Sequence, residues 1–201
     1  MSQKGCEAVY AGKSPVRLDG SDPLAVQKMK WSLQHMLSDL YKPYIHQLVV
    51  LCIGTDRSTG DALGPLTGTK LSRMQPNRTV VYGTLDDPVH AVNLSQTIEM
   101  IKQYYSYPLI IAVDACLGRI ESVGTIDLGL GSLRPGAGVH KTLPSVGEVY
   151  ISGIVNVGGF LEYFVLQNTR LSVVIKLAEV IARGLYLGLQ SVSHPAETVT
   201  Y

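Results

Sequence analysis

HQLVVLCIG, at residues 46–54, is the stretch that decides the fold class of this 201-residue chain. It is a short, continuous apolar run ending in a glycine, the pattern of a strand buried on both faces of a parallel sheet. A second run of the same kind, LIIAV, occupies residues 109–113 and is followed by Asp114. Two buried strands joined through helical segments predict an α/β protein.

Segments with helical periodicity alternate with apolar, β-branched runs along the rest of the chain. We expect helices at about residues 23–41, 63–74, 87–105 and 160–189, and further strands at residues 78–84, 125–128 and 149–157. This alternation predicts a mostly parallel sheet covered on both faces. In such sheets, functional groups gather at the carboxyl ends of the strands.

The length and composition predict one domain. A chain of 201 residues with 46% hydrophobic and 16% charged side chains can build a single core without general disorder. Residues 1–21 contain Gly and Pro but no sustained period, which predicts an irregular arm. We therefore divide the chain into an irregular arm at 1–21 and a single α/β domain at 22–201.

Charge and cysteine usage exclude several function classes. The net charge is only +1 and the basic residues are scattered, so we expect no nucleic-acid partner. The N-terminal residues lack an apolar signal core, and charges interrupt the apolar segment 171–189, so we expect no membrane partner. Three separated cysteines predict no disulfide framework. Together these features predict a cytoplasmic protein.

Asp114 is the first candidate for chemistry. It follows an apolar strand, so its carboxylate is expected at the mouth of the sheet, where such acids often serve ligands. The structural alternative is that it binds neighbouring backbone amides.

Asp61 is the second candidate and lies in the loop CIGTDRSTGDALGP, residues 52–65. The alternative role for Asp61 is to cap the helix that follows, a common use of Asp at a helix start. The loop lacks the Gly-Lys-Ser/Thr ending of a P-loop and the GxGxxG spacing of a dinucleotide site. Asp61 and Asp114 are expected to face each other across adjacent loops.

Two close carboxylates suit amide hydrolysis. Because both cannot comfortably ionise together, one can act as the base for a water and the other as the acid for a leaving group. The alternative is a divalent metal ion held by Asp61, Asp114 and an imidazole, for which His140 in a Gly-rich loop is the best candidate. Cys116 and Ser145 lack a nucleophile motif, so nucleophilic catalysis is a minor alternative.

Four blocks of the sequence resemble the YyaC family of sporulation proteins. They are IGTDRSTGDALGP (53–65), YGTLDDPVHAVNL (82–94), IAVDACLG (111–118) and PGAGVHKTLPSVGEVYISGIVNVGGFLEYFVLQNTRL (135–171). The resemblance covers about Val49 to Leu171. More distantly, the DALGP and VDA elements are similar to those of the spore germination protease, and the hydrogenase-maturation endopeptidases are similar too.

These resemblances imply a three-layer α/β/α sandwich of the phosphorylase/hydrolase type. They also imply that the two essential aspartates of the germination protease correspond to Asp61 and Asp114. The acid, acid and histidine of the maturation enzymes correspond to Asp61, Asp114 and His140. The chain differs from the germination protease in its shorter length and its His140, and from the maturation enzymes in having Asp61 where Glu is usual.

The leading hypothesis is a peptidase that acts on a protein or peptide substrate in sporulation or germination, inside the sporulating cell or the spore. The contrasting hypothesis is a non-catalytic sporulation factor that binds a peptide or protein partner in the same cleft. Tyrosines such as Tyr104, Tyr105 and Tyr107 could support a homo-oligomer or partner surface.

Overall fold

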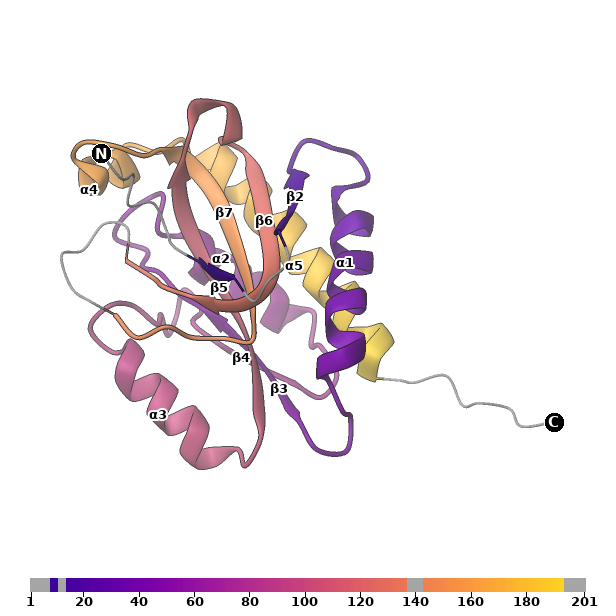
Figure 1. The fold of residues 1–201 in the computed structure, drawn as a ribbon. Helices are drawn as coiled ribbons and strands as arrows, with labels where there is room; N and C mark the ends of the chain where they lie inside the picture. The colour runs from indigo at the N-terminus through magenta and orange to yellow at the C-terminus, as the bar shows by residue number, and fades with distance from the viewer. Residues whose placement is uncertain (1–7, 11–13, 137–142, 194–201) are drawn as a thin grey trace.

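The computed structural model describes residues 8–10, 14–136 and 143–193 and has an α/β architecture (Figure 1). Its elements follow one another in the order β1 (Ala8–Tyr10), β2 (Val16–Asp19), α1 (Ala25–Leu40), β3 (Gln47–Cys52), α2 (Leu63–Arg73), β4 (Thr79–Tyr82), α3 (Leu94–Tyr104), β5 (Pro108–Gly118), a 3₁₀ turn (Ile120–Ser122), β6 (Thr125–Leu133), β7 (Val149–Val157), α4 (Glu162–Gln167) and α5 (Leu171–Ser193).

One mixed sheet forms the middle layer. Its strands lie in the order β1-β6-β7-β5-β3-β4, and β2 also pairs with β6. The pairs β4–β3, β3–β5 and β5–β7 are parallel, while β6 is antiparallel to β7, β1 and β2. Every described strand except β6 therefore points the same way, which confirms the predicted mostly parallel α/β fold.

The side chains of β3 alternate between two hydrophobic clusters, as strand geometry requires. Leu48, Val50 and Cys52 pack on the face covered by α1, α2 and α5. Val49 and Leu51 pack on the opposite face, against α3. The sheet thus lies between helices on both sides, in three layers.

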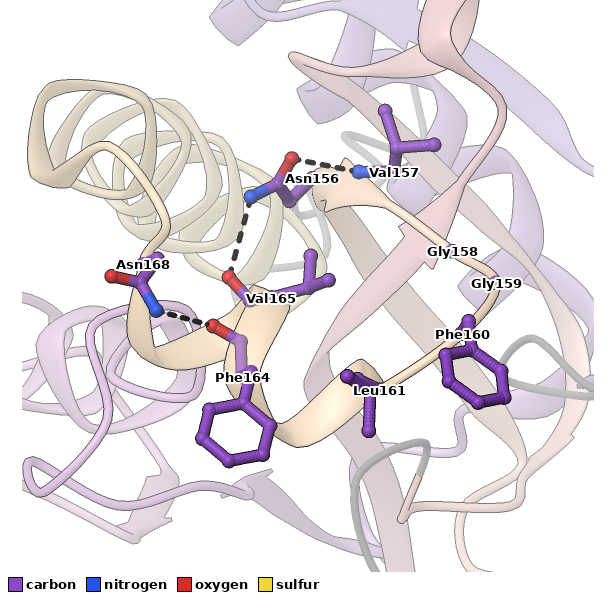
Figure 2. A pocket seen from close by; sticks show the side chains of 9 residues that line it. All are labelled: Asn156, Val157, Gly158, Gly159, Phe160, Leu161, Phe164, Val165 and Asn168. Carbon is purple, nitrogen blue, oxygen red and sulfur yellow. Dashed lines mark hydrogen bonds between the residues drawn. The ribbon is translucent and has the colours of Figure 1, made fainter.

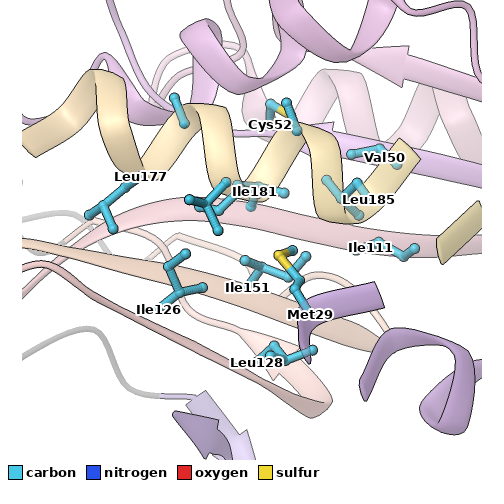
Figure 3. Packing of buried hydrophobic residues seen from close by; sticks show 14 of the residues in the cluster. Met29, Val50, Cys52, Ile111, Ile126, Leu128, Ile151, Leu177, Ile181 and Leu185 are labelled. Atoms are coloured by element: carbon cyan, nitrogen blue, oxygen red, sulfur yellow. The ribbon is translucent and has the colours of Figure 1, made fainter. Parts of the chain in front are cut away.

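Helix α5 lies across the sheet on the face that it shares with α1 and α2 (Figure 3). Its residues Leu177, Ile181 and Leu185 have at most 1% of their surface exposed and pack above the strands. This confirms the prediction of a core helix. Among the described helices, none combines the length and apolar character needed to cross a bilayer.

The N-terminal arm differs from its prediction. Residues 8–10 and 16–19 form β1 and β2, which pair with successive stretches of β6. Short edge strands of this kind take their hydrogen bonds from a distant partner, so a local period is not needed to specify them.

Two other boundaries also differ. The helix expected at 160–189 is divided into α4 and α5 by residues 168–170. The helix expected from residue 87 begins at Leu94, because Val89 instead forms a parallel bridge with Ile53.

Candidate functional site

Asp114 was predicted at the end of its strand, but it lies inside β5, four residues before the strand ends. The last pair between β3 and β5 joins Cys52 to Val113, so Asp114 is the first residue of β5 beyond the pairing with β3. Strand β5 continues to Gly118 because β7 still runs beside it. The carboxylate therefore lies beside the carboxyl end of β3, although its own strand goes on to Gly118.

The Asp114 side chain is buried, with 7% of the residue exposed. Strand alternation places it on the face of the sheet that α3 covers, because its neighbours Val113 and Ala115 belong to the opposite cluster. One hydrogen bond to it comes from the Ala115 backbone N–H, at 2.9 Å from Oδ1. The pKa of Asp114 is raised well above its ordinary value. Burial is the largest cause, and the electrostatic effects of Asp61 and, to a lesser degree, of Cys116 act in the same direction. The Ala115 N–H opposes these effects.

Asp61 is positioned by a loop that folds back on the end of β3. The Asp61 carbonyl accepts a hydrogen bond of 3.2 Å from the Thr55 N–H. Gly54 has a φ of 147° and lies so close to the Asp61 carbonyl that a Cβ would collide with it. Gly64, in the first turn of α2, lies equally close to the Ile53 carbonyl. These two glycines let the loop and α2 pack directly against the backbone of β3.

Asp61 does not cap helix α2 in the part of the chain that the structure describes. Helix α2 begins after Ala62, and no side chain of the described part of the chain makes a capping hydrogen bond there. Asp61 is half-buried. Burial raises its pKa above the ordinary value, and the nearby Ser58 side chain partly lowers it again. The influence of the Asp61 charge on Asp114 means that the two carboxylates lie within electrostatic reach of each other.

Ser58 was not singled out from the sequence, yet it is the polar side chain that most directly affects Asp61. It is 5% exposed, and its hydroxyl completes no hydrogen bond of good geometry with any described residue. The hydroxyl nevertheless lies close enough to Asp61 to lower the pKa of that carboxyl group.

A row of polar side chains crosses the sheet beside Asp114 and was also missed. Ser152 on β7 is paired in register with Asp114 on one side and with Asp127 of β6 on the other. Asp127 is paired in turn with Arg17 of β2, and the Arg17 guanidinium donates two hydrogen bonds to its carboxylate, at 2.7 and 2.6 Å. Paired residues point to the same face, so all four side chains share the face of Asp114.

The remaining predicted residues add less to the site. His140 lies outside the described residues, so its relation to Asp61 and Asp114 stays a prediction. Among the residues that the structure describes, no three His, Cys, Asp or Glu side chains form a group able to hold a metal ion. Cys116 is buried, and Ser145 accepts a hydrogen bond of 3.3 Å from Arg134 Nε.

An apolar hollow lies where β7 leads into α4 (Figure 2). We call it the Phe160 hollow; it has a volume of about 520 Å³ and is lined by residues 156–161 together with Phe164, Val165 and Asn168. It is connected to the loop of Asp61 by a hydrogen bond of 2.8 Å from the Gly60 N–H to the Leu166 carbonyl.

Comparison with known proteins agrees with the resemblance found in the motifs. Residues 18–184 match the family model described as "Protein of unknown function (DUF1256)". The chain is 60% identical to the "Uncharacterized protein YyaC" of Bacillus subtilis (strain 168) over 189 residues, which cover 93% of this chain and 90% of that protein. By both measures the chain belongs to the DUF1256 family and is a member of the YyaC family.

Proposed function

We propose that this protein is a peptidase of sporulation or germination that hydrolyses a peptide bond with Asp61 and Asp114. The observation that carries the proposal is the buried Asp114 carboxylate beside the carboxyl end of β3, where the folded-back loop also holds Asp61 and the Asp61 charge raises the pKa of Asp114. In many enzymes, two titratable groups whose environments give them different pKa values act as the general acid and the general base.

The two environments assign the two roles. Asp114 is the more deeply buried acid and keeps its proton, whereas Asp61 is half-buried and has the Ser58 hydroxyl to support its charged form. Asp61 accepts a proton from water as the water oxygen bonds to the substrate carbonyl carbon. Asp114 donates its proton to the departing amine nitrogen as the carbon–nitrogen bond breaks.

A divalent metal ion is the alternative means of activating the water. Asp61 and Asp114 would supply oxygen ligands and His140, which lies outside the described residues, a nitrogen ligand; such a donor set would suit a catalytic metal centre with an open position. Dialysis against a chelator, followed by return of Zn²⁺, Mg²⁺ or Mn²⁺, separates the two cases. The paired-acid mechanism predicts activity that is unchanged by either step.

The test of the proposal uses Asp61→Asn and Asp114→Asn, each with folding confirmed by circular dichroism. The substrate is a complex peptide mixture, and new termini are identified by mass spectrometry. Loss of a general acid or base lowers rates by about 10² to 10⁴-fold, so we expect each variant to lose cleavage almost completely. Asp56→Asn, an exposed acid in the same loop, is the matched control and is expected to cleave normally. Undiminished cleavage by Asp61→Asn or Asp114→Asn would reject the mechanism.

The second candidate function is non-catalytic binding of a peptide or protein partner, which the exposed apolar Phe160 hollow favours. It predicts that the wild-type protein binds peptides and leaves every bond in the mixture intact. Specific new termini that disappear in both aspartate variants would contradict it.

A further inference from the structure

The segment that joins β7 to α4, together with the first turn of α4, exposes apolar side chains that folded chains usually bury. Phe160 is 89% exposed, Leu161 57% and Phe164 56%. All three line the Phe160 hollow, with the two rings on either side of Leu161 (Figure 2). A contiguous apolar patch of this kind on a protein surface marks a binding site.

The chain is held in the conformation that exposes these side chains. Leu161 has φ 58° and ψ 47°, a left-handed conformation that costs about 1–2 kcal/mol for a residue other than glycine. The Asn156 side chain accepts a hydrogen bond from the Val157 N–H at 2.8 Å and donates one to the Val165 carbonyl at 3.3 Å. The Asn168 side chain donates to the Phe164 carbonyl at 2.8 Å. These hydrogen bonds fix the backbone around the hollow.

The Phe160 hollow adjoins the loop that carries Asp61. The Gly60 N–H, next to Asp61 in sequence, bonds the Leu166 carbonyl, and a Cβ on Gly60 would collide with Leu166. An extended peptide advances about 3.3–3.6 Å per residue, so a few residues of one peptide can lie between the hollow and the Asp61 loop.

The charges around the hollow restrict what it can hold. Residues 156–169 contain one charged side chain, Glu162, and no Lys or Arg. The nine residues that line the hollow are themselves uncharged, so a charged side chain placed in it would lose hydration without gaining an ion pair from the lining. An apolar peptide side chain has the complementary character.

The size of the hollow argues against a second copy of the chain as the occupant. Nine residues line it. A stable protein–protein interface uses about 20–30 residues on each side. The hollow matches one apolar side chain of a peptide and its neighbours.

We infer that the Phe160 hollow is a substrate subsite, which receives an aromatic or large aliphatic side chain of the peptide whose bond Asp61 and Asp114 cleave. The inference rests on the proposed peptidase function, because it names the substrate class of the same site. It makes Phe160 and Phe164 specificity-determining residues.

The test measures binding in the Asp114→Asn background, where cleavage cannot remove the probe. The probes are fluorescein-labelled host peptides of Ala, Ser and Gly that differ only at one central position, occupied by Phe, Leu, Ser or Asp. Fluorescence anisotropy gives the dissociation constants. We expect the Phe and Leu peptides to bind about tenfold more tightly than the Ser peptide, and the Asp peptide to bind most weakly.

Phe160→Ser and Phe164→Ser are each expected to abolish this preference. Tyr104→Ser is the matched control, because Tyr104 is 78% exposed and lies at the end of α3 that leads into the start of β5. It is expected to leave the preference unchanged. Equal binding of the Phe and Ser peptides, or an unaltered preference in Phe160→Ser, would overturn the inference.

Two further outcomes separate this inference from the proposed function. If the wild-type protein cleaves peptides and Phe160→Ser cleaves them with the same side-chain preference, the subsite is overturned and the peptidase function stands. A Phe preference in binding with no cleavage by the wild-type protein would support the subsite and overturn the peptidase.

The oligomeric state gives a further test of the occupant. If sedimentation shows a wild-type dimer that Phe160→Ser dissociates, the hollow belongs to a second copy of the chain and the inference is overturned.

Discussion

The two faces of the sheet are built from the same strands but carry different side chains. The face under α1, α2 and α5 is lined by apolar residues, such as Val50, Ile111 and Ile151, none of which is exposed. The opposite face is covered by α3 and, beside its apolar cluster, carries Asp114 with a polar row on β7 and β6. The comparison indicates that the first face supplies stability, which allows the second to hold a buried carboxylate.

The largest effect on stability is expected from the apolar face. Ile181→Ala removes a fully buried side chain between α5 and the sheet and should lower the free energy of unfolding by about 2–5 kcal/mol. Urea denaturation followed by circular dichroism measures the change. Leu187→Ala, in the same helix but 38% exposed, is the control and should cost less than half as much. Equal losses would mean that α5 does not provide the core as described.

A smaller, pH-dependent effect is expected from the polar face. The unfolded chain releases the Asp114 proton near the ordinary pKa, and the folded chain releases it at a higher pH. Between these two values the unfolded state binds fewer protons, so the free energy of unfolding falls as the pH rises. A difference of one pKa unit corresponds to about 1.4 kcal/mol.

Asp114→Asn removes this ionisation and should therefore flatten the dependence of stability on pH above about pH 4. Some slope remains, because the pKa of Asp61 is also raised by burial. Urea midpoints between about pH 4 and 8 test the prediction. Parallel curves for the wild type and the variant would show that Asp114 ionises in the folded protein as it does in the unfolded chain.

The smallest effect is expected at the outer end of the polar row. The Arg17 side chain is 52% exposed, so its ion pair with Asp127 is largely screened by solvent. Arg17→Ala should lower the free energy of unfolding by about 0.5–1 kcal/mol, and less in high salt. Urea denaturation at low and high ionic strength measures both the loss of stability and its dependence on salt. A loss as large as that of Ile181→Ala would show that the row, and not only the apolar face, supports the fold.

Local pattern predicted much of the fold. Strands β3 and β7 and helices α1 and α5 follow apolar periods that a single sequence displays. The extension of β6 to Leu133 was missed, because Gly129 and Gly131 are typical of loops and the strand is specified by its partners instead. The break between α4 and α5 was also missed.

The candidate site was predicted in part. The expectation that acids follow buried strands directed attention to Asp61 and Asp114, and in the structure the charge of Asp61 raises the pKa of Asp114. Ser152 and the Arg17–Asp127 pair could not be found in this way, because strand register joins residues far apart in sequence. A serine inside the apolar run VYISGIVNV was the available signal.

The central claim is that Asp61 and Asp114 act as one coupled pair. Its most direct test is a titration of the Asp114 side-chain carboxyl by ¹³C NMR, in the wild-type protein and in Asp61→Asn. We predict that Asp114 titrates well above the ordinary range in the wild type, and that its pKa falls when Asp61→Asn removes the neighbouring negative charge. An Asp114 pKa that is the same in both proteins would contradict the pair and the mechanism built on it.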